Sequence, residues 1–222
     1  MQFDYYFSIG VNCEGAFQIR RVLGRDSSCF FSWNVTKFDA LISLLSDSFE
    51  GTLQLKNLTP RPGTGLIFDS SHNYLLHSPF KDSDPWEGEA FENTFASLQS
   101  KFRYLIDKFY RIALSGDSVV YFYRTEEDGA QEKSKAVVQL LSKIHKADNF
   151  RFVVLQKEAF KEPDWGIPLI HNRYLKRFAP WNDATDGHVA SWDRVLASFP
   201  LARDALRLSG FDKVSDSMNE DE

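Results

Sequence analysis

The sequence predicts an α/β fold, with one domain built on a mostly parallel central sheet flanked by helices. Apolar strand-like runs alternate with amphipathic helical patterns over the second half of the chain, as expected where crossover helices join parallel strands. The first such run, about residues 3–9, is continuously apolar and aromatic. That pattern is typical of a strand buried on both faces.

Two helices are predicted after this strand. The first begins after Cys13 and ends at Gly24, because glycine readily takes the left-handed conformation that ends a helix. The second has Thr36 and Asp39 as a capping box and is expected to stop at Gly51.

The middle of the chain is less regular. Residues 52–90 are rich in turn formers, but the runs 66–70 and 73–78 predict a hairpin or strand pair. Residues 81–89 are expected to form an exposed loop. A clear apolar stripe then predicts a long amphipathic helix over about 91–112.

The last third supplies the rest of the predicted sheet. Strands are expected at 118–124 and 150–156, with a helix at about 131–147 between them. A short extended piece at 166–173 and a helix at 189–198 complete the fold. We therefore predict a single α/β domain over residues 1–214 and an acidic, disordered tail over 215–222.

Composition excludes several classes of function. The formal charge is -5 and the basic residues form no block, which argues against nucleic-acid binding. No apolar run approaches the ~20 residues of a membrane span, and the N-terminus does not resemble a signal peptide. Two cysteines cannot form a disulfide framework and lack the paired spacing of a zinc site. We expect a cytoplasmic protein with reduced thiols, no metal and no cofactor, since the glycine fingerprints of nucleotide sites are missing too.

Cys13 is the leading candidate for chemistry. It falls between the first strand and the following helix, where free backbone N–H groups and the helix dipole favour a thiolate. The amides of residues 13 and 14 could also stabilise an oxyanion. Small or polar neighbours such as Asn12 leave room for a substrate. The alternative is that Cys13 is simply a small buried residue, because most free cysteines are inert.

A thiol nucleophile needs a base, and the five histidines are the candidates. His77 ends a predicted strand, a position suited to presenting a side chain at a sheet edge. His72 is expected to be solvated, His145 to lie on the polar side of a helix, and His171 is a reserve candidate. His188 follows Asp186, which suits an N-cap better than a catalyst.

Further residues are taken as substrate-binding or orienting groups: Asn12, Glu14, Trp33 and Arg124. Arg124 ends a predicted strand, where α/β sheets commonly place functional groups. It could bind an anionic group, orient another side chain or form a structural ion pair. Trp33 could line a pocket or anchor its loop.

The stretch "SIGVNCEGAFQIRR" resembles the opening motif of a bacterial family named putative papain-like cysteine peptidases. Four later blocks resemble the family in the same order: "FFSWNVT", "NYLLHSPF", "YFYR" and "DGHVASWDRVLASF". This resemblance implies Cys13 as nucleophile and His77 as its partner. Two positions depart from the family pattern, because Ser32 precedes Trp33 and Ser78 follows His77 where acidic residues are expected.

Two hypotheses follow. The first is a thiol hydrolase or acyltransferase with a Cys13–His77 dyad, in which the pKa of Cys13 is held below the ~8.5 of an ordinary thiol. Its substrate would be a peptide, an ester or a surface-polysaccharide precursor. The second is a noncatalytic carbohydrate-associated module beside a glycosyltransferase, binding through Trp33, Arg124 and the loop "KDSDPWEG". A serine-type esterase ending in Asp186 and His188 lacks a serine motif.

Overall fold

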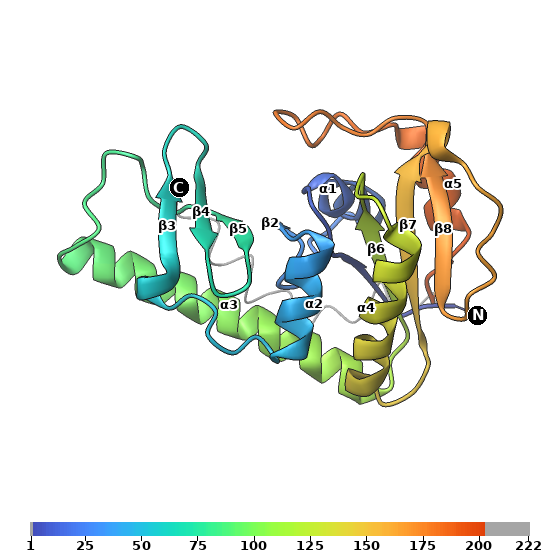
Figure 1. Cartoon of the computed structure of the whole chain (residues 1–222), viewed down its shortest axis with the longest axis horizontal. Coiled ribbons are helices and arrows are strands. Elements are labelled where there is room, and N and C mark those ends of the chain that lie inside the picture. The colour runs from blue at the N-terminus through green and yellow to red at the C-terminus, as the bar shows by residue number, and fades with distance from the viewer. Residues whose placement is uncertain (1, 203–222) are drawn as a thin grey trace.

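The parallel sheet predicted from the sequence is present in the computed structural model, which describes residues 2–202. Its strands run in the order β1-β6-β7-β8, and every neighbouring pair is parallel. Their bounds are Tyr5–Ser8 (β1), Val119–Arg124 (β6), Phe150–Lys157 (β7) and Ile170–Leu175 (β8). The carboxyl ends of all four strands therefore meet at one edge, which is at the top of Figure 1.

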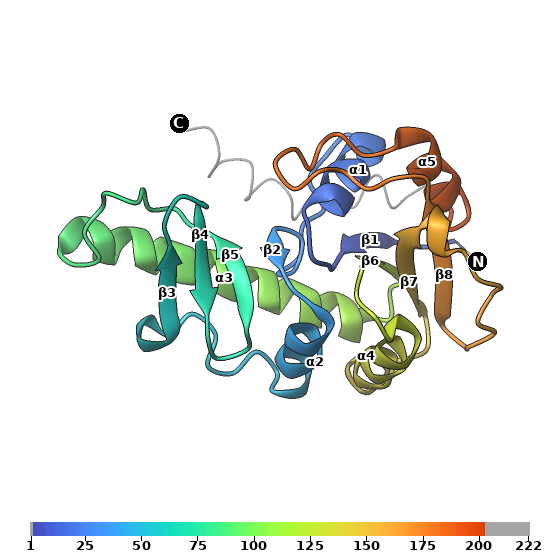
Figure 2. The same cartoon turned by 45° about the horizontal axis from the view of Figure 1, so that its top comes forward.

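Helices cover both faces of this sheet. Helices α1 (Glu14–Leu23) and α5 (Val189–Ala197) lie on one side, and α2 (Phe38–Ser46) and α4 (Ala130–Ile144) lie on the other (Figure 2). The long helix α3 (Glu89–Ser115) runs from the small second sheet to the parallel sheet (Figure 1). This arrangement confirms the α/β class.

Strand β6 shows why helices must pack on both faces of the parallel sheet. Val120 and Phe122 pack into an apolar cluster with residues of α1 and α5. Tyr121 and Tyr123 point the other way, into a larger cluster with residues of α2, α3 and α4. Because side chains alternate along a strand, a strand that is apolar at every position is stable only between two such layers.

A small antiparallel sheet has the strand order β2-β5-β4-β3. The bounds are Asn34–Val35 (β2), Leu58–Arg61 (β3), Leu66–Asp69 (β4) and Tyr74–His77 (β5). The hairpin of β4 and β5 confirms the sequence prediction. Strands β2 and β3 were not predicted; β3 contains Pro60, which an edge strand tolerates because proline has no N–H for a second neighbour. There are also two short 3-10 turns. Leu55–Asn57 (η1) directly precedes β3, and Glu158–Phe160 (η2) directly follows β7.

The predicted limits of α2 are wrong at both ends. Its N-cap is Lys37, and the Thr36 hydroxyl has no hydrogen-bond partner among the described residues, so Thr36 and Asp39 form no capping box. The helix ends at Ser46, before Gly51, because Ser48 and Phe49 take left-handed backbone angles (φ 52° and 62°).

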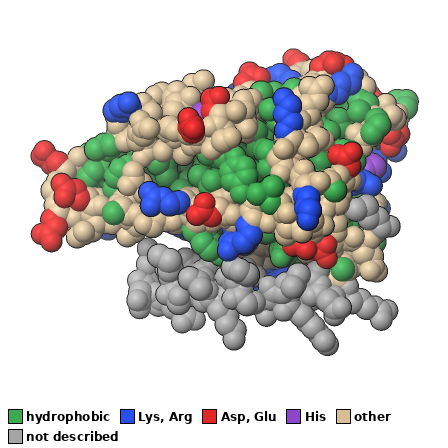
Figure 3. Space-filling view, turned by 90° about the horizontal axis from the view of Figure 1, so that it is seen from below, with side chains coloured by type: hydrophobic (Ala, Val, Ile, Leu, Met, Phe, Trp, Pro, Cys, Tyr) green, Lys and Arg blue, Asp and Glu red, His purple; other side chains and the backbone are tan. Residues whose placement is uncertain are grey.

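The lower face of the molecule carries a band of hydrophobic side chains with charged groups around it (Figure 3). Phe95, Ile106 and Tyr110 of α3 are partly buried against the larger cluster. None of the helices within residues 2–202 combines the length and the hydropathy that crossing a bilayer requires. The predicted tail, 215–222, lies outside the described residues, and the single-domain boundary at 214 stays a prediction.

Candidate active site

Cys13 occupies the N-cap position of α1 and is half-buried. Its carbonyl oxygen accepts the first hydrogen bond of the helix, from Phe17 N at 3.1 Å. Asn12 Oδ1 accepts a hydrogen bond from Glu14 N at 2.7 Å, which closes a tight turn around the cysteine. The sequence therefore places the thiol at the start of α1, as predicted, but one of the two expected oxyanion donors, the amide of residue 14, is already engaged.

The structure brings Cys13 and His77 together: Cys13 Sγ lies 3.4 Å from His77 Nε2. His77 is the last residue of β5 and is exposed, and its backbone is held in register opposite Leu66 of β4. This distance is within the hydrogen-bond reach of a thiol and an imidazole.

Strand β2 explains how a residue of the small sheet reaches α1. It pairs with β5, with Asn34 opposite Leu76. Its far end is tied to the loop after β1 by a hydrogen bond from Thr36 N to Gly10 O at 3.1 Å. In both views β2 is the strand of the small sheet that lies nearest the parallel sheet (Figures 1 and 2). No pattern in the sequence indicates this two-residue strand, so the contact between Cys13 and His77 could not be predicted from spacing.

Burial sets the charge state of the pair. It raises the pKa of the Cys13 thiol to about 11. Although His77 as a whole residue is exposed, partial desolvation of its ring lowers the pKa of the imidazole. The expectation of a thiol pKa below the ordinary value is thus wrong for the resting protein. At neutral pH the pair is a neutral thiol beside a neutral imidazole.

No third side chain orients His77 within the described part of the chain, where its ring has no hydrogen bond besides the one to Cys13. Ser78 Oγ is engaged with the backbone N and O of Phe80. Ser32 is buried and bridges Ser8 O, at 3.2 Å, and Cys29 N, at 3.0 Å. The two serines that replace the acidic residues of the family pattern therefore have structural roles.

Glu14, the residue after Cys13, forms a buried ion pair with Arg124. Glu14 is fully buried, and its Oε2 lies 3.3 Å from Arg124 Nε, without the alignment of a hydrogen bond. The carboxylate also accepts hydrogen bonds from Ala179 N, at 3.0 Å, and from Trp192 Nε1, at 2.9 Å. The guanidinium of Arg124 stacks on Phe178 at 4.1 Å. Of the alternatives for Arg124, the geometry supports an ion pair that positions α1.

The residues that complete this arrangement were missed by sequence reasoning. Phe178 and Ala179 belong to the loop after β8, which arches over α1 in Figure 1, and Trp192 belongs to α5. They are more than 160 positions from Glu14 in the sequence, and no local pattern links them to it.

Trp33 does not join the thiol and the imidazole. Its Nε1 donates to Ser28 Oγ at 2.6 Å, its ring meets Phe17 edge-on, and Arg20 lies over it at 4.9 Å. These contacts anchor the loop that carries Trp33 to α1. Of the two roles considered for Trp33, lining a pocket or anchoring its loop, the contacts support the second.

The other histidines have structural surroundings. His72 is buried, not solvated, between Ser43 Oγ at 2.8 Å and Glu50 O at 2.7 Å. His145 is also buried, beside the Tyr121 hydroxyl at 2.8 Å, so its predicted polar surroundings are wrong.

His171 packs its ring on Phe199 at 5.3 Å. His188, and not Asp186, is the N-cap of α5, through its contacts with Ser191. Asp186 pairs with Arg177 instead. Within residues 2–202 Asp186 forms no hydrogen bond with His188, so these two residues do not make the acid–histidine pair of a serine-type hydrolase.

Within residues 2–202 no three His, Cys, Asp or Glu side chains cluster in a way that could hold a metal ion.

The model of a family described as "Putative papain-like cysteine peptidase (DUF1796)" matches residues 4–159, a range that includes Cys13, His77 and Arg124. No curated protein and no solved structure matches the chain.

Proposed function

The chain belongs to the family of putative papain-like cysteine peptidases, and from this membership and the site geometry we propose that it is a thiol hydrolase or acyltransferase with a Cys13–His77 dyad. The observation that carries the proposal is the 3.4 Å separation of Cys13 Sγ and His77 Nε2. A nucleophile within hydrogen-bond reach of a base is one of the two geometric features of covalent catalysis, the other being a group that orients the base.

The neutral resting pair favours general-base activation. As Cys13 Sγ attacks a carbonyl carbon, its proton passes to His77 Nε2, and a tetrahedral oxyanion forms. The imidazolium then protonates the leaving amine or alcohol, and a thioester remains on Cys13. Water, or another nucleophile in an acyl transfer, gives up a proton to His77 and attacks the thioester, which restores the thiol.

Two donors next to the nucleophile are available for the oxyanion. One is the Cys13 backbone N–H at the start of α1, where the helix dipole favours negative charge. The other is Asn12 Nδ2, which has no hydrogen bond within residues 2–202, while Oδ1 of the same side chain holds the turn. Glu14 and Arg124 act as positioning residues, because they fix the first turn of α1 against the end of β6.

A generic activated ester tests this function without knowledge of the natural substrate. We expect p-nitrophenyl acetate to acetylate Cys13 with a burst of nitrophenolate, which mass spectrometry would locate by peptide mapping. His77→Ala should slow the burst by about 10²- to 10⁴-fold, the usual contribution of a general base.

The chain provides a matched control for this experiment. Cys29 is fully buried, so Cys29→Ala should keep the burst while Cys13→Ala abolishes it. A burst that survives in Cys13→Ala, or acetylation that is independent of His77, would refute the dyad. No burst in a folded wild-type protein would favour the noncatalytic carbohydrate-associated module.

A further inference from the structure

A cavity of about 350 Å³ opens at the carboxyl edge of the parallel sheet, beyond the ends of β6 and β7. Its walls are the connection from β6 into α4, the end of β7 and the segment that follows β7, including Phe160 and Trp165. Ligand sites in open α/β sheets lie at this edge. The volume is at the lower end of the ~300–1,000 Å³ of small-molecule sites.

The charges around this cavity, which we call the β6–β7 cavity, favour a cation. Four carboxylates line it, and Lys157 is the one basic residue in its wall. They belong to Glu126, Glu127, Asp128 and Glu162. Lys157 is already paired with Glu126. An anion would meet net negative charge here, although the N-terminus of α4 is close.

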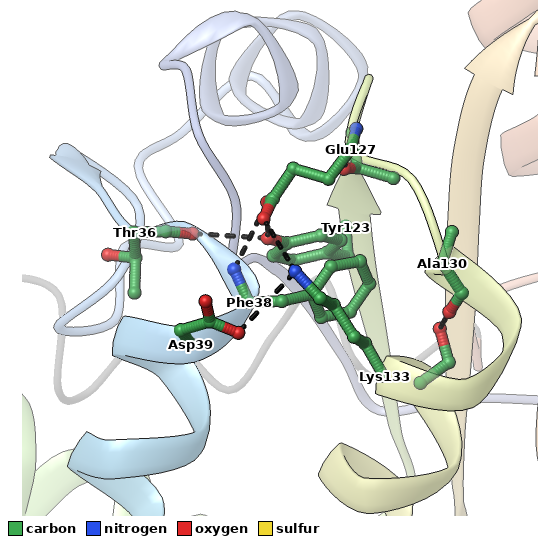
Figure 4. A network of polar contacts seen from close by, with 9 residues as sticks. Thr36, Phe38, Asp39, Tyr123, Glu127, Ala130 and Lys133 are labelled. Atoms are coloured by element: carbon green, nitrogen blue, oxygen red, sulfur yellow. Dashed lines mark hydrogen bonds and ion pairs between the residues drawn. The ribbon is translucent and has the colours of Figure 1, made fainter.

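Not all of these carboxylates have hydrogen-bond or ion-pair partners among the described residues. Glu127 is held by Phe38 N, the Tyr123 hydroxyl and Lys133 (Figure 4). Asp128, in contrast, is exposed and has no hydrogen bond or ion pair within the described residues. It can therefore pair with an incoming charge.

Two aromatic rings complete the wall. Phe160 is 63% exposed, which is unusual for a phenylalanine and leaves its ring free to contact a ligand. Trp165 is fixed by a hydrogen bond from its Nε1 to Glu162 Oε2 at 2.9 Å. Aromatic faces beside carboxylates attract organic cations through the ring quadrupole.

A separate observation points to a missing hydrogen-bond donor. Gln156 lines the cavity, and its Oε1 is buried without a hydrogen-bond partner among the described residues. A buried acceptor left unpaired is costly, and an ammonium or guanidinium N–H would satisfy it.

Arg124 connects the wall of this cavity to the segment that carries Cys13. Arg124 immediately precedes the cavity wall, pairs with Glu14 on one side and lies 3.6 Å from Glu126 on the other. Its backbone also packs against Gly10, three residues before Cys13, since a Cβ on Gly10 would come within 3.2 Å of Arg124 N.

We propose that the β6–β7 cavity is a subsite for a basic side chain, the guanidinium or ammonium group of an arginine or lysine in a peptide substrate. Its role as a substrate subsite rests on the proposed function, whereas the binding of the cation does not. The carboxylates supply the charge, the rings cover the aliphatic stem, and Gln156 accepts a hydrogen bond.

Binding is tested on the full chain carrying Cys13→Ala, so that a failure of the catalytic proposal leaves the result intact. The probe is Nα-acetyl-arginine methylamide, titrated by calorimetry, with Nα-acetyl-norleucine methylamide as the neutral analogue. We expect the arginine probe to bind at least about tenfold more tightly than the norleucine probe, and to weaken at high salt.

Variants locate the site. Trp165→Ala should weaken the arginine probe about tenfold, and Asp128→Asn, an exposed change that leaves the fold intact, should weaken it several-fold. Trp181→Ala is the matched control, because Trp181 is 63% exposed and does not line the cavity. Three results would overturn the assignment. The first is equal binding of the arginine and norleucine probes, and the second is unchanged binding of the arginine probe in Asp128→Asn. The third is tighter binding of free agmatine than of the acetylated arginine probe.

Discussion

At the scale of the residue, Cys13 and His77 form a pair in which both members are neutral at rest. The dipole of α1 and its free N–H groups favour a thiolate, but burial disfavours any isolated charge. Burial raises the pKa of the Cys13 thiol to about 11, which favours the neutral thiol at rest. Activation then depends on proton transfer to His77 during the attack, not on a thiolate formed beforehand.

This charge state predicts the pH dependence of alkylation. A thiol with a pKa of about 11 gains thiolate continuously up to that pH, so the rate of iodoacetamide labelling at Cys13 should still be rising at pH 10. At pH 8 the rate should be about 100-fold below that of a thiol with the reference pKa of 9.0. Peptide mapping by mass spectrometry gives the rate at Cys13 separately from Cys29. A plateau below pH 8 would show a preformed thiolate and contradict this prediction.

The two residues were predictable to different degrees. Cys13 is visible from local pattern alone, because it stands where a buried strand gives way to a helix. His77 is 64 residues away, and only the family resemblance separated it from the other histidines. The serine substitutions at Ser32 and Ser78 were visible as departures, but their structural roles depend on backbone partners that no motif encodes.

At the scale of the element, α1 is fixed by a carboxylate at its first position. Glu14 joins α1 to β6 through Arg124, to the loop after β8 through Ala179, and to α5 through Trp192. A buried charge is tolerated only when it is paired and hydrogen-bonded, and here both conditions are met. The same contacts hold Cys13 in place, because it directly precedes Glu14.

We therefore expect Glu14→Gln to lower the free energy of unfolding by about 3 kcal/mol, because it removes one charge of a buried pair. Glu126→Gln is the matched control: Glu126 pairs with the same arginine but is half exposed, so its loss should cost less than about 1 kcal/mol. Urea denaturation monitored by circular dichroism measures both. Equal losses in the two variants would mean that the buried pair does not hold α1.

Helix α2 shows why some element boundaries escaped the sequence. Its N-terminus receives a carboxylate from Glu127, which accepts from Phe38 N at 3.1 Å across 89 residues (Figure 4). Lys133 connects that carboxylate to Asp39. A capping box was predicted because Thr36 and Asp39 have the right spacing. Glu127, from the connection between β6 and α4, caps the helix instead.

At the scale of the whole molecule, the alternation of strands and helices was sufficient to predict the parallel sheet. Strands β1, β6 and β7 are rich in apolar residues, and α4, which joins β6 to β7, has a clear amphipathic pattern. Strand β8 has more polar residues, and no helix joins it to β7. The small sheet was only half predicted. Strand β2 has only two residues, and β3 is mostly exposed and contains Pro60. Neither strand therefore shows a hydrophobic periodicity that could be recognised in the sequence. Both are defined by pairing with the β4–β5 hairpin, which is a tertiary effect.

The core also contains a titratable group that couples folding to pH. His145 follows α4, its Nε2 lies 2.8 Å from the Tyr121 hydroxyl, and its ring packs on Phe150 at 4.6 Å. Its Nδ1 is buried with no hydrogen-bond partner among the described residues. Burial lowers the pKa of His145 from 6.5 to about 4, because the core cannot solvate the imidazolium.

The sign of the effect on stability follows from this lowered pKa. Between pH 6.5 and about 4 the unfolded chain binds a proton at His145 that the native protein does not, so stability falls as the pH falls through that window. The loss from this group should reach about 3 kcal/mol. His145→Gln, which cannot titrate, should remove that part of the slope while it leaves the contributions of other groups, as urea denaturation at a series of pH values would measure. If wild type and His145→Gln lose stability in parallel from pH 6.5 to 4, the imidazole is accessible to protons in the native state and the core is looser around Tyr121 than the structure describes.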